Sequence, residues 1–124
     1  IFSELIIQNK RPTIFGDGSK TRDYVFVSDV VAANVIVLND KIGTGEIYNL
    51  GWGKEITDLE VFQTVRNALS SRVEPIFDQK RPGEIDHISL DSSKATRVLG
   101  WRPKVAFEEG VKLSVAYYQE RIKS

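Results

Sequence analysis

The chain has 124 residues, a length that suits a single domain. Its 17 basic and 17 acidic residues give a formal net charge of zero, so no global field attracts nucleic acid or a membrane surface. It has no cysteine and one histidine, His87, which excludes disulfides, thiolate nucleophiles and multi-histidine metal sites. No apolar run is long enough to span a membrane and no signal peptide is visible, so the cytoplasm is the expected location.

The first predicted element is a helix over residues 1–9, whose apolar residues have helical spacing but no preceding cap. Because the pattern begins in mid-helix at Ile1 rather than at a Met, we interpret the sequence as part of a longer chain. Strands are expected at 13–15 and 23–27, which are rich in β-branched and aromatic residues. The turn Gly16-Asp17-Gly18 ends the first strand.

The next pair of elements is a helix over 30–39, with Ser28-Asp29 as its cap, and a strand over 46–50. The helix is apolar almost all round, and such a helix is covered on both sides. Gly51-x-Gly53 follows the strand as in a dinucleotide-binding turn. Ile56 stands where that fingerprint needs a third glycine, so we interpret these glycines as structural.

The second half of the sequence carries clear helix-boundary signals. Thr57 and Glu60 form a capping box that opens a helix to about Ser70. The later expected elements are strands at 75–77 and 87–90, a short helix capped by Asp91 and ended by Gly100, and a last helix over 107–122. This alternation of helices and strands predicts an α/β fold of mixed α+β arrangement.

Standard catalytic motifs are absent from the sequence. It has no G-x-S-x-G elbow and no phosphate-binding P-loop. It also has no Tyr-x-x-x-Lys pair, because the residues four positions after its tyrosines are Ser28, Trp52, Arg121 and Ile122. We therefore expect no catalytic, cofactor-binding or metal-binding residue in this chain.

Two arginines next to turns are the candidates for ligand binding. Arg22 opens a predicted strand, and Arg81 lies on the turn Arg81-Pro82-Gly83 with Glu84 three residues on. The planar guanidinium matches phosphate oxygens two at a time, so two converging arginines could hold a diphosphate. A nearby carboxylate could accept hydrogen bonds from a ribose diol. For either arginine alone, a surface ion pair is the simpler interpretation.

The joint pattern resembles the C-terminal half of the extended short-chain dehydrogenase/reductase superfamily. The residues that carry the resemblance run in order along essentially the whole chain: Pro12-Thr-Ile-Phe-Gly-Asp-Gly18, Thr21-Arg-Asp-Tyr-Val-Phe-Val27, Ile47-Tyr-Asn-Leu-Gly51, Arg81-Pro-Gly-Glu84 and Leu99-Gly-Trp101. Within its NAD-dependent epimerase/dehydratase family, the sequence is most similar to UDP-glucose 4-epimerases, in their C-terminal part only. Dehydratases, decarboxylases and GDP-sugar enzymes share much of the pattern.

The resemblance implies a substrate-binding lobe that holds the UDP part of a UDP-sugar, while NAD in an N-terminal Rossmann half removes and returns a hydride at C4. The substrate-binding residues implied by motif match are Thr13 and Phe15 at the uracil, Arg22 and Arg81 at the diphosphate, Tyr24 beside Arg22, and Glu84 at the ribose. Many relatives have Asp in place of Glu84. Trp52 has no assigned role.

The Rossmann half, with its NAD site and Tyr-x-x-x-Lys pair, is missing from this sequence. We therefore expect the chain alone to bind no NAD and to be inactive. Strand 46–50 would belong to the missing sheet, and its loss would leave apolar surface that favours a homodimer or other self-association. Two alternatives stay open: the same lobe of a dehydratase or decarboxylase, and an interaction module that binds no ligand.

Overall fold

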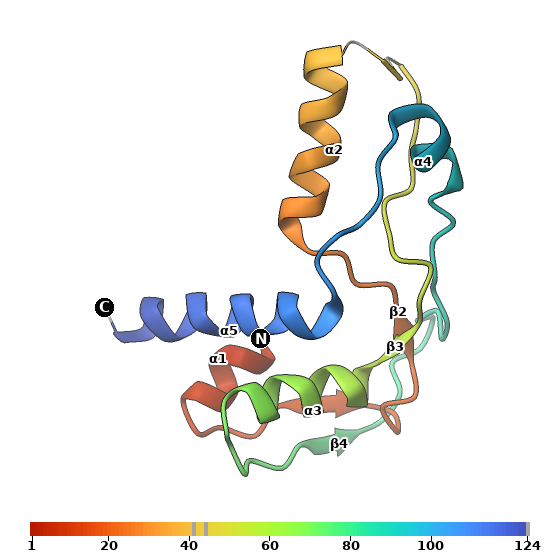
Figure 1. Cartoon of the computed structure of the whole chain (residues 1–124). Coiled ribbons are helices and arrows are strands. Elements are labelled where there is room, and N and C mark those ends of the chain that lie inside the picture. Colours follow the sequence, from red (N-terminus) through yellow and green to blue (C-terminus); the bar gives the residue numbers. More distant parts are fainter. Residues whose placement is uncertain (41, 44, 124) are drawn as a thin grey trace.

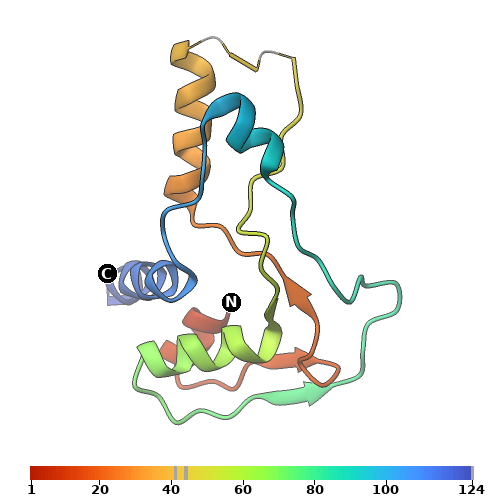
Figure 2. The ribbon, with the colours of Figure 1, turned by 45° about the vertical axis from the view of Figure 1, so that its right-hand side comes forward.

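The computed structural model describes residues 1–40, 42–43 and 45–123. Its helices are α1 (Phe2–Ile7), α2 (Val27–Asp40), α3 (Asp58–Ala68), α4 (Ser93–Leu99) and α5 (Phe107–Lys123). Its strands are β1 (Thr13–Phe15), β2 (Thr21–Arg22), β3 (Ile56–Thr57) and β4 (Ile76–Asp78). Figures 1 and 2 show two bodies, one built from α1, α3, α5 and the strands, and a second in which α4 lies beside α2. The mixed α/β class expected from the sequence is confirmed.

The first body has a core where three helices meet β1. Ile14 of β1 and Phe62 of α3 are each 1% exposed, and they pack with Ile6, Val65 and Val115. The capping box at the start of α3 is present as predicted, with the Glu60 amide donating to the Thr57 hydroxyl and the Thr57 amide donating to Glu60. This core fixes β1 and the beginning of α3, which support the candidate site.

The second body has its own small core, formed by Ala33, Ala95, Leu99 and Trp101. Gly100 ends α4 in the left-handed conformation, with φ of 65°, as its sequence position predicts. Asp29, in the first turn of α2, connects this helix to the segment before α5. Its carboxylate accepts from the Lys104 and Val105 amides at 3.0 Å each, and its carbonyl accepts from the Trp101 indole.

The predicted strand at 23–27 is wrong. Pairing with β3 involves only Thr21 and Arg22, and the chain then leaves the sheet. The Phe26 carbonyl accepts hydrogen bonds from the amides of Asp29 and Val30, so α2 begins at Val27. The predicted cap at Ser28-Asp29 is wrong for the same reason, because both residues lie inside the first turn of the helix.

The predicted strands at 46–50 and 87–90 are not strands in the described part of the chain. Residues 46–50 meet no neighbouring strand there, and Tyr48 and Leu50 pack instead on the core of the second body. Residues 87–90 are held by side chains rather than by a ladder, since the Leu90 amide donates to Asp23 and His87 contacts the Thr21 hydroxyl. A strand needs a neighbouring backbone to pair with, which apolar alternation alone does not supply.

Candidate functional site

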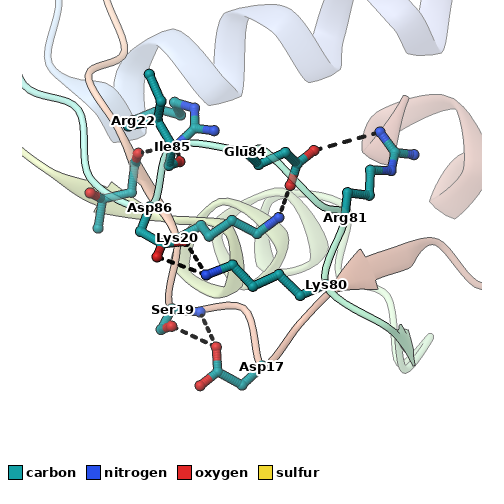
Figure 3. Close-up of polar contacts among 10 residues, drawn as sticks. Asp17, Ser19, Lys20, Arg22, Lys80, Arg81, Glu84, Ile85 and Asp86 are labelled. Carbon is teal, nitrogen blue, oxygen red and sulfur yellow. Dashed lines mark hydrogen bonds and ion pairs between the residues drawn. The ribbon is translucent and has the colours of Figure 1, made fainter.

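The candidate site lies where two loops leave the β1–β4 pair. The two strands are parallel, with Phe15 opposite Asp78, so the loops that follow them emerge at the same end. The Gly16 amide donates to the Asp78 carbonyl, and the Thr21 amide donates to the Asp86 carbonyl, both at 2.8 Å. The segments at 17–22 and 80–86 are thereby held side by side (Figure 3).

Gly18 allows the first loop to pack tightly against the core. Its φ is 81°, and a Cβ there would lie 3.1 Å from Leu59 and 3.3 Å from Ile14. The Gly18 carbonyl accepts from the Leu59 amide, and the Lys20 carbonyl accepts from the Asp58 amide. The loop is therefore fixed to the start of α3 by backbone contacts, which gives its side chains a defined position.

Arg81 and Phe15 form the centre of the site. The Arg81 guanidinium carbon lies 3.6 Å from the centre of the Phe15 ring, which is cation–π stacking. The Arg81 side chain is 58% exposed, and its Nη1 lies 3.8 Å from Oε1 of Glu84. The structure thus brings together three of the predicted residues, and the outward edge of the guanidinium remains free to bind an anion.

Lys20 is a site residue that the sequence analysis missed. It is only 6% exposed, and its Nζ donates to Oε2 of Glu84. This hydrogen bond lowers the pKa of Glu84 below its usual value, and the charges of Arg81 and Arg22 act in the same direction. The carboxylate is therefore ionised at neutral pH. The one sequence signal was the two-residue spacing of Lys20 and Arg22, which places both on one face of an extended segment.

Arg22 lies on the opposite side of Glu84 from Arg81 (Figure 3). Its Nη1 donates to the Thr21 carbonyl at 2.6 Å and to the Ile85 carbonyl at 2.9 Å. Arg22 therefore anchors the 80–86 loop as well as adding positive charge. The two loops together carry one net positive charge, which suits an anionic ligand, from four basic and three acidic residues: Lys20, Arg22, Lys80, Arg81, Asp17, Glu84 and Asp86.

Among the described residues, Thr13 and Tyr24 form no side-chain hydrogen bond or ion pair with the cluster around Glu84, although the charge of Arg22 acts on the Tyr24 hydroxyl. Thr13 is two residues before Phe15 on β1, so both side chains share one face of the strand. Tyr24 packs on Phe107 with ring centres 5.6 Å apart, and burial raises the pKa of its hydroxyl. It lines a cavity of ≈ 240 Å³ beside Trp52. Tyr24 is thus two residues from Arg22 in the chain, but its ring packs on Phe107 of α5.

The Gly51-Trp52-Gly53 turn is not a nucleotide-binding loop. Its three amides, which would have to face a pyrophosphate, are already occupied. The Gly51 amide donates to the Ser92 hydroxyl, and the Trp52 and Gly53 amides donate to the Asp23 carboxylate at 2.9 and 2.8 Å. A Cβ on Gly51 would lie 2.6 Å from that carboxylate, so this glycine serves packing, as the sequence indicated. These residues do not fit the pyrophosphate of NAD.

The residues that the structure describes contain no group of three or more His, Cys, Asp or Glu side chains that could hold a metal ion. None of the helices in this described part is both long and apolar enough to cross a membrane.

Comparisons with known proteins identify the family and the fold of the chain. The family model of GDP-mannose 4,6 dehydratase matches residues 2–114. UDP-glucose 4-epimerase of Mycolicibacterium smegmatis is 40% identical over 121 residues, covering 98% of this chain and 38% of the relative. The crystal structure of UDP-glucose 4-epimerase with UDP-glucose from Thermotoga maritima superposes with a TM-score of 0.92 at 37% identity, covering 98% of this chain and 38% of that one. The Thermus thermophilus UDP-glucose 4-epimerase in complex with NAD gives a TM-score of 0.83 at 33% identity, covering 95% of this chain and 38% of that one.

Fold and sequence together define a domain of the nucleotide-sugar epimerases and dehydratases. The chain belongs to the GDP-mannose 4,6 dehydratase family of the extended short-chain dehydrogenase/reductase superfamily, as the resemblance indicated. It spans little more than a third of the length of the relatives that it matches, 38% for the M. smegmatis enzyme.

Proposed function

We propose that this chain is the C-terminal, UDP-holding part of a UDP-glucose 4-epimerase. Phe15 and Thr13 line the uracil site, Arg22 and Arg81 bind the diphosphate, and Glu84 accepts from the ribose hydroxyls. Tyr24 contributes beside Arg22. The observation that supports this proposal most directly is the cluster around Glu84. There Arg81 stacks on Phe15, and its guanidinium is still accessible because the side chain is 58% exposed. An aromatic ring, a phosphate-binding fork and a carboxylate acceptor therefore adjoin, and these are the three kinds of group that a nucleoside diphosphate requires.

The reaction itself belongs to the remainder of the intact enzyme. NAD, bound by an N-terminal Rossmann half, supplies hydride transfer at C4 of the sugar in that enzyme. This chain's residues hold the nucleotide, so that the sugar can turn while UDP stays in place. We propose no catalytic, cofactor or metal role for any residue here, an inactive isolated chain, neither nucleic acid nor membrane as a partner, and the cytoplasm as its location.

A dehydratase of the same superfamily is the second candidate. The observation in its favour is the matching family model, which describes GDP-mannose 4,6 dehydratase rather than an epimerase. The cluster of Arg22, Arg81 and Glu84 contacts parts that all nucleoside diphosphates share, and it does not by itself select a base. The preferred nucleotide therefore distinguishes the two candidates.

The test is a titration of the chain with UDP, GDP and dTDP, followed by backbone NMR shifts, with NAD as the control. We expect UDP to shift the signals of Phe15, Arg22 and Arg81 at lower concentrations than the other ligands, because UDP-glucose 4-epimerases are among the relatives that match nearly the whole chain. Tighter binding of GDP or dTDP would move the proposal to a dehydratase. Absence of binding by all three nucleotides would support an interaction module instead.

We also propose that the apolar face of α2 docks against the missing N-terminal half, with residues 46–50 adding a strand to its sheet. Val31, Val35 and Leu38 are 51%, 46% and 76% exposed on this helix, and Ile47 is 85% exposed. Exposed apolar patches of this kind mark interaction surfaces. The chain covers 38% of the M. smegmatis enzyme. The remaining part of such an enzyme is long enough to form the surface that packs on this face.

In isolation the chain is therefore expected to self-associate through this face. Sedimentation velocity should show a weight-average mass that rises with concentration, and Val31→Lys with Leu38→Lys should shift it toward the 14.0 kDa monomer. Leu113→Lys, which changes an exposed apolar residue on α5, is the matched control and should leave the association unchanged. A monodisperse monomer at high concentration would contradict the prediction.

A further inference from the structure

Glu84 has two cationic neighbours that differ in burial. Lys20 is 6% exposed and donates to Oε2, whereas the Arg81 side chain is 58% exposed and lies 3.8 Å from Oε1 (Figure 3). Lys20 therefore makes the hydrogen bond, and Arg81 stays at a longer distance on the Phe15 ring. Oε2 of the carboxylate is occupied by Lys20, whereas Oε1 lies toward Arg81 at a distance too long for a hydrogen bond.

The position of Lys20 is fixed by the fold rather than by the ion pair. Its carbonyl accepts from the Asp58 amide at 2.9 Å at the start of α3, in the loop that Gly18 packs against Leu59. A buried lysine on a rigid loop can orient a partner, because its own side chain has little freedom. An aspartate in place of Glu84 would not extend as far toward Lys20. The longer side chain therefore allows the contact between the carboxylate and Lys20.

Without Lys20, no hydrogen bond from a described side chain would hold Glu84 away from Arg81. Arg22 acts on this carboxylate only through its charge, since it donates to backbone carbonyls. An arginine and a carboxylate three residues apart, once free, can form a bidentate pair with two parallel hydrogen bonds. That pair would occupy both carboxylate oxygens. It would also turn the guanidinium away from Phe15 and from an incoming phosphate.

We propose that Lys20 is a positioning residue for nucleotide binding: it holds Glu84 so that one oxygen stays free for the ribose hydroxyls and Arg81 stays free for the diphosphate. This inference rests on the proposed nucleotide site and adds to it the group that sets ribose recognition. Lys20 itself does not touch the ligand. Its effect is therefore measured as the part of the UDP affinity that depends on the ribose hydroxyls.

The test compares UDP with the diphosphate of 2′,3′-dideoxyuridine, which lacks both ribose hydroxyls, by isothermal titration of the full chain. The unaltered chain should bind UDP about tenfold more tightly, which corresponds to one lost hydrogen bond to a charged group. In Lys20→Met this ratio should fall to near one, and the Kd for UDP should rise about tenfold. Lys20→Arg, which keeps a buried donor, should restore most of the ratio.

Lys80→Met is the matched control. Lys80 lies in the neighbouring loop and pairs with Asp86 at 2.5 Å, but it is half exposed and does not contact Glu84. Its replacement should leave the ratio unchanged. A ratio that Lys20→Met leaves unaltered, in a chain that binds UDP, would overturn the role of Lys20 and spare the proposed function. A chain that binds neither ligand would contradict both.

A second measurement applies even if Lys20→Met does not fold. The carboxyl carbon of Glu84 can be titrated by NMR in the unaltered chain, where Lys20 should hold its pKa below the ordinary 4.5. A value at or above 4.5 would show that Lys20 does not hold the carboxylate, and the proposal would fall.

Discussion

Replacing Arg81 by alanine is expected to raise the Kd for UDP about 10- to 100-fold, the loss of one charged phosphate contact. The physical reason is the combination of exposure and orientation at this residue. Stacking on Phe15 at 3.6 Å holds the guanidinium plane, and the side chain is 58% exposed, so its donors can reach a ligand without a rearrangement. Isothermal titration of the purified chain with UDP measures the effect.

The fold should tolerate this substitution, because an exposed ion pair at 3.8 Å adds little to stability. Arg81→Lys keeps the charge but not the planar fork, so it should recover only part of the affinity. Arg72→Ala, at another exposed arginine, is the matched control and should change nothing. An unchanged Kd in Arg81→Ala would mean that Arg81 only covers Phe15.

Replacing Asp23 by alanine is expected to lower the free energy of unfolding by about 2–3 kcal/mol, since backbone donors would lose their acceptor. The Asp23 carboxylate accepts from the amides of Trp52, Gly53 and Leu90, which come from two separate segments. The Trp52 and Leu90 amides are partly buried, so water would replace these bonds incompletely. Urea denaturation followed by circular dichroism measures the change.

Asp17→Ala offers the comparison for this second prediction. Asp17 also accepts from a backbone amide, that of Ser19 at 2.9 Å, but at an exposed turn. Its replacement should cost less than about 1 kcal/mol, as for most surface positions. If Asp23→Ala were no more destabilising than Asp17→Ala, the carboxylate would not be holding the two segments together.

Several elements could be predicted because their signals are local. The capping box of Thr57 and Glu60, the end of α4 at Gly100 and the long apolar stripe of α5 each depend on residues within a few positions of one another. Such signals act through hydrogen bonds and backbone conformations inside one element. The structure accordingly has these helices where the sequence placed them, within a few residues.

The errors fall where an element depends on a partner far away in the chain. The predicted strands at 23–27, 46–50 and 87–90 have suitable residues but no neighbouring backbone among the described ones. Asp23 takes the place of ladder contacts for Leu90 of the last segment, and it holds the turn at Trp52 and Gly53 that follows residues 46–50. Sheet pairing is a tertiary event, so β-rich composition alone does not decide it.

The sequence by itself determined the family, the mixed α/β class and most of the candidate site residues, because the family's motifs follow one another along this chain in the same order. Only the tertiary structure decided how they meet. It placed Arg81 on Phe15 and brought the buried Lys20 to Glu84 across 64 positions of sequence. It also gave the backbone amides of the Gly51 turn their hydrogen-bond acceptors, which are the side chains of Asp23 and Ser92. Contacts over such separations depend on the packing of β1, β4 and α3, which local patterns do not record.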